Sequence, residues 1–453
     1  MSRIATYIGI TMLTCGLGFG QTEYTVLWSF AGAPMDGATP TGNLVADNAG
    51  HLYGTTSGGG SAPACAPIGG CGTVFQLSKN PNNSWTETVL YNFCSNFSDS
   101  GCLDGAYPKA GLLIDSKGNL YGTTTIGGSS TVCGFPGCGG GTVFKVSPPM
   151  APGGSWTETV LYNFCIDTNK CLDGAVPLSN LTSDSLGNLY GTTSIGGSGH
   201  ASGGTVFQLS PAQGSWSQKV LYNFCSLGSG EACPDGKQPM AGVTFDRKGN
   251  LYGTTYLGGS QNFAGGGTLY KLTPGQSGWT ESVLLAGRGP SGAGPLGMVT
   301  FDPFGNIFST FSAGGPAGVG GVFRYVPGVG RNLFWFDGKD GYAPAAGVLI
   351  DSKKASLYGT TSGAGFTFGT VFQISAPKQE TVLYTFCSQQ NCVDGFDPVA
   401  GLVMDKSGNL YGTTKMGGAN GLGVVFQITP AADQKPKAPL ASAKSLLADK
   451  ASK

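Results

Sequence analysis

Short runs of apolar and β-branched residues alternate with glycine-rich turns along most of this chain. Residues 110–164 give the clearest unit, with an apolar run at 110–115, NLYGTT at 119–124, GTVFKVS at 141–147 and WTETVLYNF at 156–164. The last segment alternates Thr, Thr, Leu and Asn with Glu, Val, Tyr and Phe, which is the pattern of a strand with two different faces. Turns separate these segments, so the unit is predicted to form four antiparallel strands.

The second segment of this unit recurs along the whole chain. Leu-Tyr-Gly-Thr-Thr occurs six times, and a divergent copy at Ile307–Phe311 fills the gap in the series. Its aromatic residue returns every 50 to 69 residues, a period typical of propeller blades or of a solenoid. The copies begin at Leu52, Leu120, Leu189, Leu251, Ile307, Leu357 and Leu410.

The two ends of the repeat array complement each other. The seventh unit ends after its third strand at 423–429, whereas Glu23–Phe30 has the fourth-strand pattern and no unit before it. Pairing the two closes a ring without open sheet edges, while a solenoid needs capping repeats. The sequence therefore predicts an all-β fold: a seven-bladed β-propeller over residues 21–430, closed by an N-terminal strand that completes the last blade.

The chain ends differ from the repeats. Arg3 and the apolar run Ile4–Phe19 predict a signal peptide over residues 1–20. A membrane anchor is the alternative, but about 20 apolar residues are needed to span a bilayer and this run has 16. Cys15 suggests a lipoprotein, although the residues before it form a poor lipobox. Residues 431–453, rich in Lys and Ala, predict a flexible tail rather than a short helix, so we expect a secreted or periplasmic protein without a membrane span after cleavage.

Cysteine spacing supports export. Of 13 cysteines, removal of the signal peptide leaves six close pairs, which in an exported chain predict disulfides. Zinc is the alternative, but it needs four converging ligands, and the chain has two His and no C-x-x-C. Each bridge closes a short loop and contributes about 2 to 2.5 kcal/mol on the chain-entropy model. The pairs are Cys65/Cys71, Cys94/Cys102, Cys133/Cys138, Cys165/Cys171, Cys225/Cys233 and Cys387/Cys392.

Charge excludes one class of partner. Residues 21–430 carry 19 basic and 23 acidic side chains, which argues against nucleic-acid binding. No cofactor or metal is predicted either, and we expect a monomer.

The full motif D-x-x-G-N-L-Y-G-T-T-x-x-G-G…G-T-V-F-x-[LIV], seen at Asp115–Val146 and with variation at Asp405–Ile428, resembles the GloVer tandem-repeat family of exported bacterial proteins. The resemblance covers about 400 residues and recurs seven times. More distantly, the motif looks like the blade repeat of two-component-regulator sensor propellers. The resemblance implies a propeller outside the cytoplasm and supplies no activity or catalytic residue. The chain lacks a recognisable C-terminal sorting signal, which weighs against surface anchoring.

In a propeller, the loops from second to third strand and from fourth to first strand share one face, and here they carry all six cysteine pairs. We call it the disulfide face. Function concentrates on long loops held by a rigid scaffold, and side chains there that break the repeat are the candidate ligand-binding residues. Aromatic rings beside polar groups suit sugars. These candidates are Tyr107, Lys109, His200, Lys237, Tyr342, Phe396 and Asp397.

Two sets of aspartates recur with the repeat. An Asp-Gly pair in the fourth-to-first loops fits a tight turn, or else a carboxylate ring that holds Ca²⁺ or sugar hydroxyls. A second Asp precedes each far-face hairpin turn and is interpreted as structural. Tyr of LYGTT and Phe of GTVF are expected to pack between blades, and the Trp residues that open fourth strands to cover blade edges. The Asp-Gly aspartates are Asp36, Asp104, Asp173, Asp235, Asp340 and Asp394.

These observations favour a binding or scaffold protein for glycans or cell-surface polymers. No G-x-S-x-G, H-E-x-x-H or P-loop string is present, and no catalytic residue is assigned. The alternative is an extracellular propeller enzyme, a polysaccharide lyase or lactonase-like hydrolase with its site on the disulfide face, near His200 as base or in the divergent fifth blade. A surface-layer or matrix component is a third, structural possibility. Whether the chain is an enzyme stays open.

Overall fold

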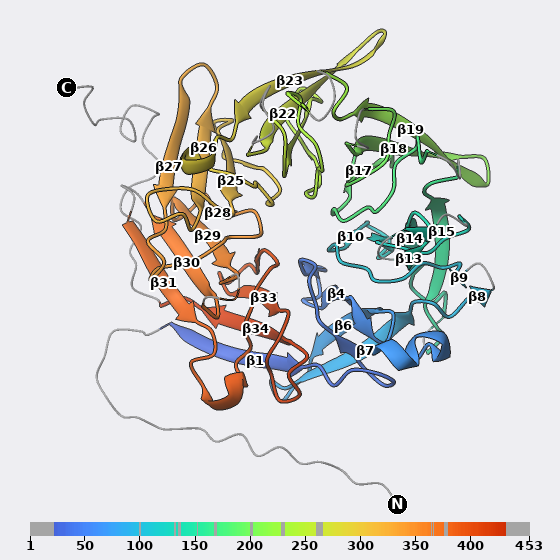
Figure 1. The fold of residues 1–453 in the computed structure, drawn as a ribbon. Helices are drawn as coiled ribbons and strands as arrows, with labels where there is room; N and C mark the ends of the chain where they lie inside the picture. Colours follow the sequence, from blue (N-terminus) through green and yellow to red (C-terminus); the bar gives the residue numbers. More distant parts are fainter. Residues whose placement is uncertain are drawn as a thin grey trace, which may run out of the picture.

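Seven four-stranded antiparallel sheets surround a common centre in the computed structural model of the protein (Figure 1). This confirms the predicted seven-bladed propeller. The structure describes residues 22–98, 101–130, 133–134, 137–151, 153–166, 170–199, 203–227, 232–259, 266–363, 365, 367–375 and 379–431. The predicted signal peptide, Cys15 and nearly all of the predicted tail lie outside them.

Each blade is built from four successive strands, and only the seventh takes one from elsewhere in the chain. Blades 1 to 4 are β3 (Val45–Ala46), β4 (Leu52–Thr56), β6 (Thr73–Lys79), β7 (Trp85–Asn92); β10 (Leu113–Ile114), β11 (Leu120–Thr124), β14 (Thr142–Ser147), β15 (Thr157–Asn163); β16 (Thr182–Ser183), β17 (Leu189–Thr193), β18 (Thr205–Ala212), β19 (Ser215–Asn223); and β20 (Thr244–Phe245), β21 (Leu251–Thr255), β22 (Thr268–Gly275), β23 (Gly278–Ala286).

Blades 5 to 7 are β24 (Thr300–Phe301), β25 (Ile307–Phe311), β26 (Gly321–Val326), β27 (Gly330–Trp335); β28 (Leu349–Asp351), β29 (Ser356–Thr361), β30 (Thr370–Ser375), β31 (Gln379–Thr385); and β32 (Val403–Met404), β33 (Leu410–Thr414), β34 (Val424–Thr429), β1 (Glu23–Ser29). The loops hold β2 (Gly37–Ala38), β5 (Gly58–Gly59), β8 (Phe97–Ser98), β9 (Gly101–Cys102), β12 (Cys133–Gly134), β13 (Gly137–Cys138), and the 3₁₀ turns η1 (Pro63–Ile68), η3 (Gly289–Ser291) and η4 (Gln390–Cys392).

The N-terminal strand β1 closes the ring. It pairs antiparallel with β34 from Glu23 opposite Thr429 to Ser29 opposite Val424, and Figure 1 shows the two ends of the described chain side by side in this last blade. The Tyr24 ring stacks on Tyr384 of blade 6 with ring centroids 3.8 Å apart. The predicted closure is therefore confirmed.

Four residues of the LYGTT motif each have a separate role in packing the blades. In blade 1, Leu52 is buried and Tyr53 packs between blades. A Cβ at Gly54 would lie 2.6 Å from the Phe75 ring, so only glycine leaves room for that ring. Thr55 donates a hydrogen bond of 2.7 Å to the carbonyl of Ala110 in the next blade, which ties neighbouring blades together.

This inter-blade hydrogen bond is repeated at six of the seven interfaces. At the seventh, where blade 7 meets blade 1, the buried Thr413 hydroxyl has no hydrogen-bond partner among the described residues. The six donors are Thr55, Thr123, Thr192, Thr254, Thr310 and Thr360.

The predicted first strand is too long. Residues 110–115 were expected to form it, but β10 is only Leu113–Ile114. Tyr107, three residues before Ala110, is in the left-handed region at φ 55°. The Gly111 N–H then donates to the Asn180 side chain instead of to a neighbouring strand. The preceding segment instead lines the centre of the ring.

The tryptophans that open fourth strands pack across blade interfaces. The Trp156 ring lies 6.3 Å from the Tyr53 ring of the preceding blade, and Trp85 lies 6.3 Å from Tyr411. Trp216 and Trp279 pack into the clusters of Tyr121 and Tyr190 in the same way. The tryptophans therefore cover blade edges as expected, and what each one covers is the LYGTT tyrosine of the preceding blade.

Five of the six predicted disulfides lie within the described residues, and all five are formed: Cys65–Cys71, Cys94–Cys102, Cys165–Cys171, Cys225–Cys233 and Cys387–Cys392. For the sixth pair, the backbones of Cys133 and Cys138 are paired across β12 and β13, while their side chains lie outside the described residues. These bridges fit an extracellular or periplasmic protein. Within the described part of the chain, no helix is long and apolar enough to span a membrane.

Candidate functional site

A proline-led segment brings the chain into the centre of the ring before every first strand. The residue before each proline has φ between 51° and 60° in all seven copies. In blade 2, for example, the Tyr107 N–H donates 2.8 Å to the carbonyl of Cys71 in the preceding blade, so the turn is fixed by the neighbouring loop. The prolines are Pro40, Pro108, Pro177, Pro239, Pro295, Pro344 and Pro398.

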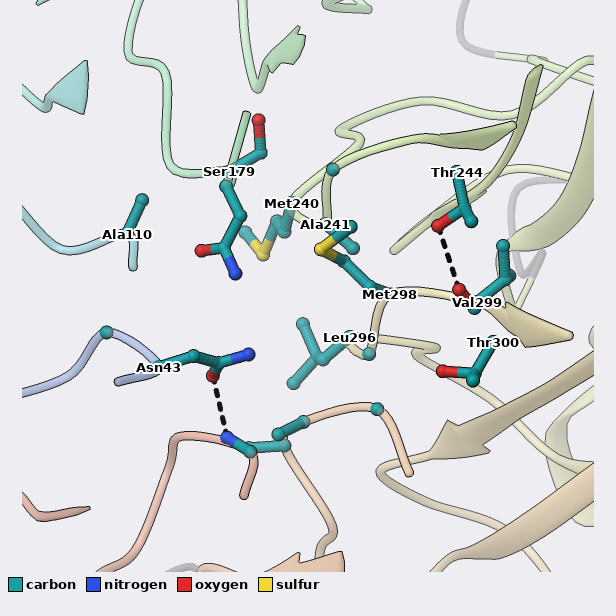
Figure 2. Close-up of a pocket in the computed structure, with 18 of the residues that line it drawn as sticks. Asn43, Ala110, Ser179, Met240, Ala241, Thr244, Leu296, Met298, Val299 and Thr300 are labelled. Atoms are coloured by element: carbon teal, nitrogen blue, oxygen red, sulfur yellow. Dashed lines mark hydrogen bonds between the residues drawn. The ribbon is translucent and has the colours of Figure 1, made fainter. Parts of the chain in front are cut away.

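These segments enclose a cavity of about 620 Å³ at the centre of the propeller (Figure 2). Apolar side chains from Met240, Leu296 and Met298 project toward it beside the Asn43 amide. Lys109 is the one titratable side chain among the residues that line it. A cavity of this size has the dimensions of a small-molecule or sugar site, and its lining exposes polar and apolar surface in similar amounts.

Seven residues, one from each proline-led segment, form a ring that we call the neck, and six of the seven line the cavity. Long side chains and glycines alternate around this ring. Because seven is an odd number, the alternation is broken once, where Gly347 and Gly401 are neighbours. The Asn43 side-chain oxygen accepts a hydrogen bond of 2.7 Å from the Gly401 N–H, and that of Asn180 accepts one of 2.7 Å from the Gly111 N–H. In ring order, the neck residues are Asn43, Gly111, Asn180, Gly242, Met298, Gly347 and Gly401.

The neck glycines are not equivalent, which gives a first test. A Cβ at Gly347 would lie 2.4 Å from the Met298 carbonyl oxygen, whereas one at Gly401 would lie 3.3 Å from the Asn43 side chain. We expect Gly347→Ala to lower the free energy of unfolding by about 1–3 kcal/mol, because overpacked backbone must move. Gly401→Ala is the matched control, with an expected loss below about 1 kcal/mol. Urea unfolding of both variants measures the difference, and equal losses would contradict this neck geometry.

The structure places the described candidate residues in equivalent segments around the ring, without bringing them all together. Lys237, Tyr342 and Phe396 occupy one repeat position, two residues before the proline, and Tyr107 and Asp397 the next. Lys109 follows the proline and is the candidate that lines the cavity. His200 lies outside the described residues. Sequence reasoning missed the neck asparagines, whose signal was the replacement of glycine in a repeated position.

Tyr107 is half-buried against two neighbouring disulfides rather than open to the cavity. Burial raises the pKa of its hydroxyl. The four sulfurs of Cys65–Cys71 and Cys94–Cys102 lie within 4.8 Å of one another. Cysteine spacing does not predict that these four residues converge, and in the structure all four form the two bridges.

Phe396 and Asp397 form a local cluster between blades 6 and 7. The Phe396 ring lies edge-on to Phe368 at 5.8 Å, and an Asp397 carboxylate oxygen lies 3.5 Å from the Lys415 ammonium. Tyr342 packs at the interface of blades 5 and 6, and Lys237 is half-buried in a bridge with Leu257. These four residues thus pack against neighbouring loops and at blade interfaces.

The Asp-Gly aspartates have a structural role. Asp104 is buried, and one of its oxygens accepts hydrogen bonds from the Tyr91 hydroxyl at 2.7 Å and the Ser95 N–H at 2.9 Å. Asp394 accepts the same pair of bonds from Tyr384 and Ser388. The carboxylates point into the blade interfaces, and none of the six lines the central cavity. Their geometry supports the turn interpretation over a carboxylate ring at the channel mouth.

The far-face aspartates hold their hairpin turns as predicted. One Asp115 oxygen accepts the N–H groups of Lys117 and Asn119 at 2.8 and 2.9 Å, and the other accepts the Tyr121 hydroxyl at 3.1 Å. The LYGTT tyrosine thus has two roles: its ring packs between blades, and its hydroxyl donates a hydrogen bond to the aspartate of the far-face turn.

A family model described as the Gloeobacter/Verrucomicrobia repeat matches residues 17–263 and again residues 239–441. The chain belongs to this family. The Gloeobacter/Verrucomicrobia repeat thus coincides with the propeller, and the resemblance inferred from the motif is confirmed. No curated protein matches the sequence.

Several solved structures are similar to this member of the repeat family. They include the extracellular domain of a putative hybrid two-component system from B. thetaiotaomicron (13% identity, 93% of this chain and 44% of that one, TM-score 0.49) and a PL25 polysaccharide lyase described as an ulvan lyase (8%, 90% and 96%, 0.49). A putative 6-phosphogluconolactonase from Bacteroides uniformis matches at 12% identity over 78% and 86%, with a TM-score of 0.44. Identities this low say nothing about activity.

Proposed function

We propose that this chain is an extracytoplasmic, monomeric binding or scaffold protein that takes a glycan or cell-surface polymer at the central cavity. The composition of the cavity carries the proposal. Its lining offers amides, hydroxyls and apolar surface, which suit sugar hydroxyls and ring faces. A general acid–base pair requires two titratable groups within reach of the substrate, and among the described residues of the lining only Lys109 is titratable.

A glycan array followed by binding to cavity variants tests this function. Ala345 lines the cavity, and the equivalent residue is larger in every other blade, so Ala345→Met should narrow the cavity without unfolding the protein. We expect Lys109→Ala and Ala345→Met each to weaken binding of the selected glycan by about tenfold, the loss of one charged hydrogen bond or of the space for one group. Lys406→Ala, on an exposed far-face turn, is the control and should bind like the parent protein.

Turnover of the selected glycan would overturn the binding role in favour of the propeller enzyme. A His200→Ala variant then identifies its base, since an unchanged rate eliminates His200. Binding that is insensitive to both cavity variants would exclude the central cavity as the binding site.

A further inference from the structure

Three blades, 5, 6 and 7, lack the tryptophan that opens the fourth strand in the other four blades. At four interfaces this side chain packs against the LYGTT tyrosine of the preceding blade. In blades 3 and 4 the tryptophan pairs with a proline at the end of the third strand, as Trp279 does with Pro274. In blade 5 the equivalent proline is Pro327, and Val329 takes the place of the tryptophan. Val329 is 67% exposed, so this position of blade 5 supplies no indole to Tyr252 of blade 4.

A hollow of about 770 Å³ is present at this interface. It lies on the face opposite the disulfide loops, since hairpin turns between first and second strands line it. Tyr252, Phe304 and Pro327 supply aromatic and apolar surface, and the Phe304 ring is 58% exposed. The Lys271 ammonium lies 5.9 Å from the centre of the Tyr252 ring, a cation–π distance.

The charged groups of the hollow favour an anionic ligand. Asp246 is occupied by its own turn, accepting from the N–H groups of Lys248 and Asn250 and from the Tyr252 hydroxyl at 2.8, 2.9 and 3.2 Å. Asp302 is likewise bonded to the N–H groups of its turn. The cations Arg247, Lys248 and Lys271 form no ion pair with a carboxylate of the described residues. Three cations therefore face the hollow against two carboxylates that are already hydrogen-bonded.

We propose that this hollow between blades 4 and 5 binds an acidic saccharide. The sugar ring stacks on Phe304, and its carboxylate or sulfate groups bind Arg247, Lys248 and Lys271, because an aromatic face with adjacent cations matches a ring that carries negative charge. The site is independent of the central cavity and of the function proposed for it.

Two substitutions and one matched control test this site. Val329→Trp restores the missing cover and should abolish binding. Lys271→Gln introduces the residue that stands at this strand position in blades 1 and 3, Gln76 and Gln208, so the fold should be kept while affinity falls about tenfold. Lys145→Gln changes the equivalent lysine of blade 2, where Trp216 packs in the same cluster as Tyr121, and should bind like the parent protein.

Calorimetric titration with a galacturonic acid trimer, a sulfated disaccharide and a neutral galactose trimer gives the result. We expect binding of an acidic probe that weakens with salt, a loss of binding in Val329→Trp and Lys271→Gln, and no change in Lys145→Gln or in the cavity variant Lys109→Ala. The two acidic probes separate carboxylate from sulfate recognition. Equal binding of the neutral trimer, no binding of either acidic probe, or equal effects of the two lysine variants would overturn the proposal. If Val329→Trp fails to fold, the two lysine variants decide alone.

Discussion

Phe30→Ala is expected to lower the free energy of unfolding by about 3–5 kcal/mol, the usual loss for a large aromatic core residue. Phe30 is fully buried directly after β1, with its ring 5.2 Å from the Phe75 ring of blade 1. It occupies the position of Phe93, Phe164 and the other fourth-strand phenylalanines, but it comes from the start of the chain. Its burial therefore depends entirely on ring closure.

Urea unfolding measures the effect, with Phe164→Ala as the matched control. Phe164 is also fully buried, in a cluster with Phe207 at the interface of blades 2 and 3, but its blade is built without the N-terminal strand. Similar losses in both variants are expected if β1 is an integral strand. A loss in Phe164→Ala with none in Phe30→Ala would show that the propeller folds without its N-terminal strand.

Most of the fold could be predicted because each blade repeats the same packing requirements. LYGTT contains a buried leucine, a tyrosine that packs between blades, a glycine that leaves room for a phenylalanine ring, and two hydrogen-bonding threonines. Because several positions repeat, the period remains visible when one of them is replaced. The first strands were the exception. An apolar run such as 110–115 is consistent with a strand or with the lining of a central cavity, and hydrophobicity alone does not separate the two.

The candidate site was less predictable for a related reason. Residues that break the repeat are candidates for function, but Phe396 packs against the Phe368 ring of a neighbouring loop and Tyr342 packs at the interface of blades 5 and 6. The hollow at blade 5 lies where the tryptophan of blades 1 to 4 is missing. That absence is visible in the sequence, but its consequence depends on knowing that the indole covers the tyrosine of the preceding blade.

Replacing the glutamates buried in the blade interfaces should stabilise the propeller in alkaline solution. In blade 2, burial and then the Asp104 charge raise the pKa of Glu158 to about 8, and one of its buried oxygens has no hydrogen-bond partner. Besides Asp104, the Tyr91 hydroxyl also faces it. Burial acts in the same way on three equivalent glutamates, with the pKa of Glu87 raised to about 8 and those of Glu281 and Glu380 to about 7.

Two blades already carry a neutral donor at this position. In blade 3 the Gln218 amide donates 3.1 Å to the carbonyl of Asp173, and in blade 7 the Tyr24 hydroxyl donates to the carbonyl of Asp394. A protonated glutamate can donate the same hydrogen bond to the backbone carbonyl of the Asp-Gly aspartate. An ionised glutamate cannot donate, and it is repelled by that carbonyl oxygen and by the aspartate carboxylate. Glu87 and Glu158 are therefore expected to be mainly neutral acids at and below neutral pH, whereas Glu281 and Glu380 become neutral below pH 7.

The direction of the pH dependence follows from the raised values. Below the ordinary glutamate pKa of about 4.5, the side chain is protonated in both states and its contribution is fully present. As pH rises toward 7–8, the unfolded chain has lost protons that the folded chain keeps, so the free energy of unfolding falls, and it levels off above the folded pKa. The propeller should thus be less stable at pH 9 than at pH 5 by the sum of four such contributions.

A reciprocal exchange between blades isolates the effect. Glu158→Gln should raise the free energy of unfolding at pH 9 by about 1–2 kcal/mol, a value discounted for partial exposure, and leave it nearly unchanged at pH 5. Gln218→Glu should do the reverse, with a loss at pH 9 that disappears at pH 5. Urea unfolding of both variants at the two pH values measures these changes. An effect of either substitution that is the same at both pH values would mean that packing, rather than the charge of the glutamate, determines stability at this position. Only an ionising group can make the change in the free energy of unfolding depend on pH.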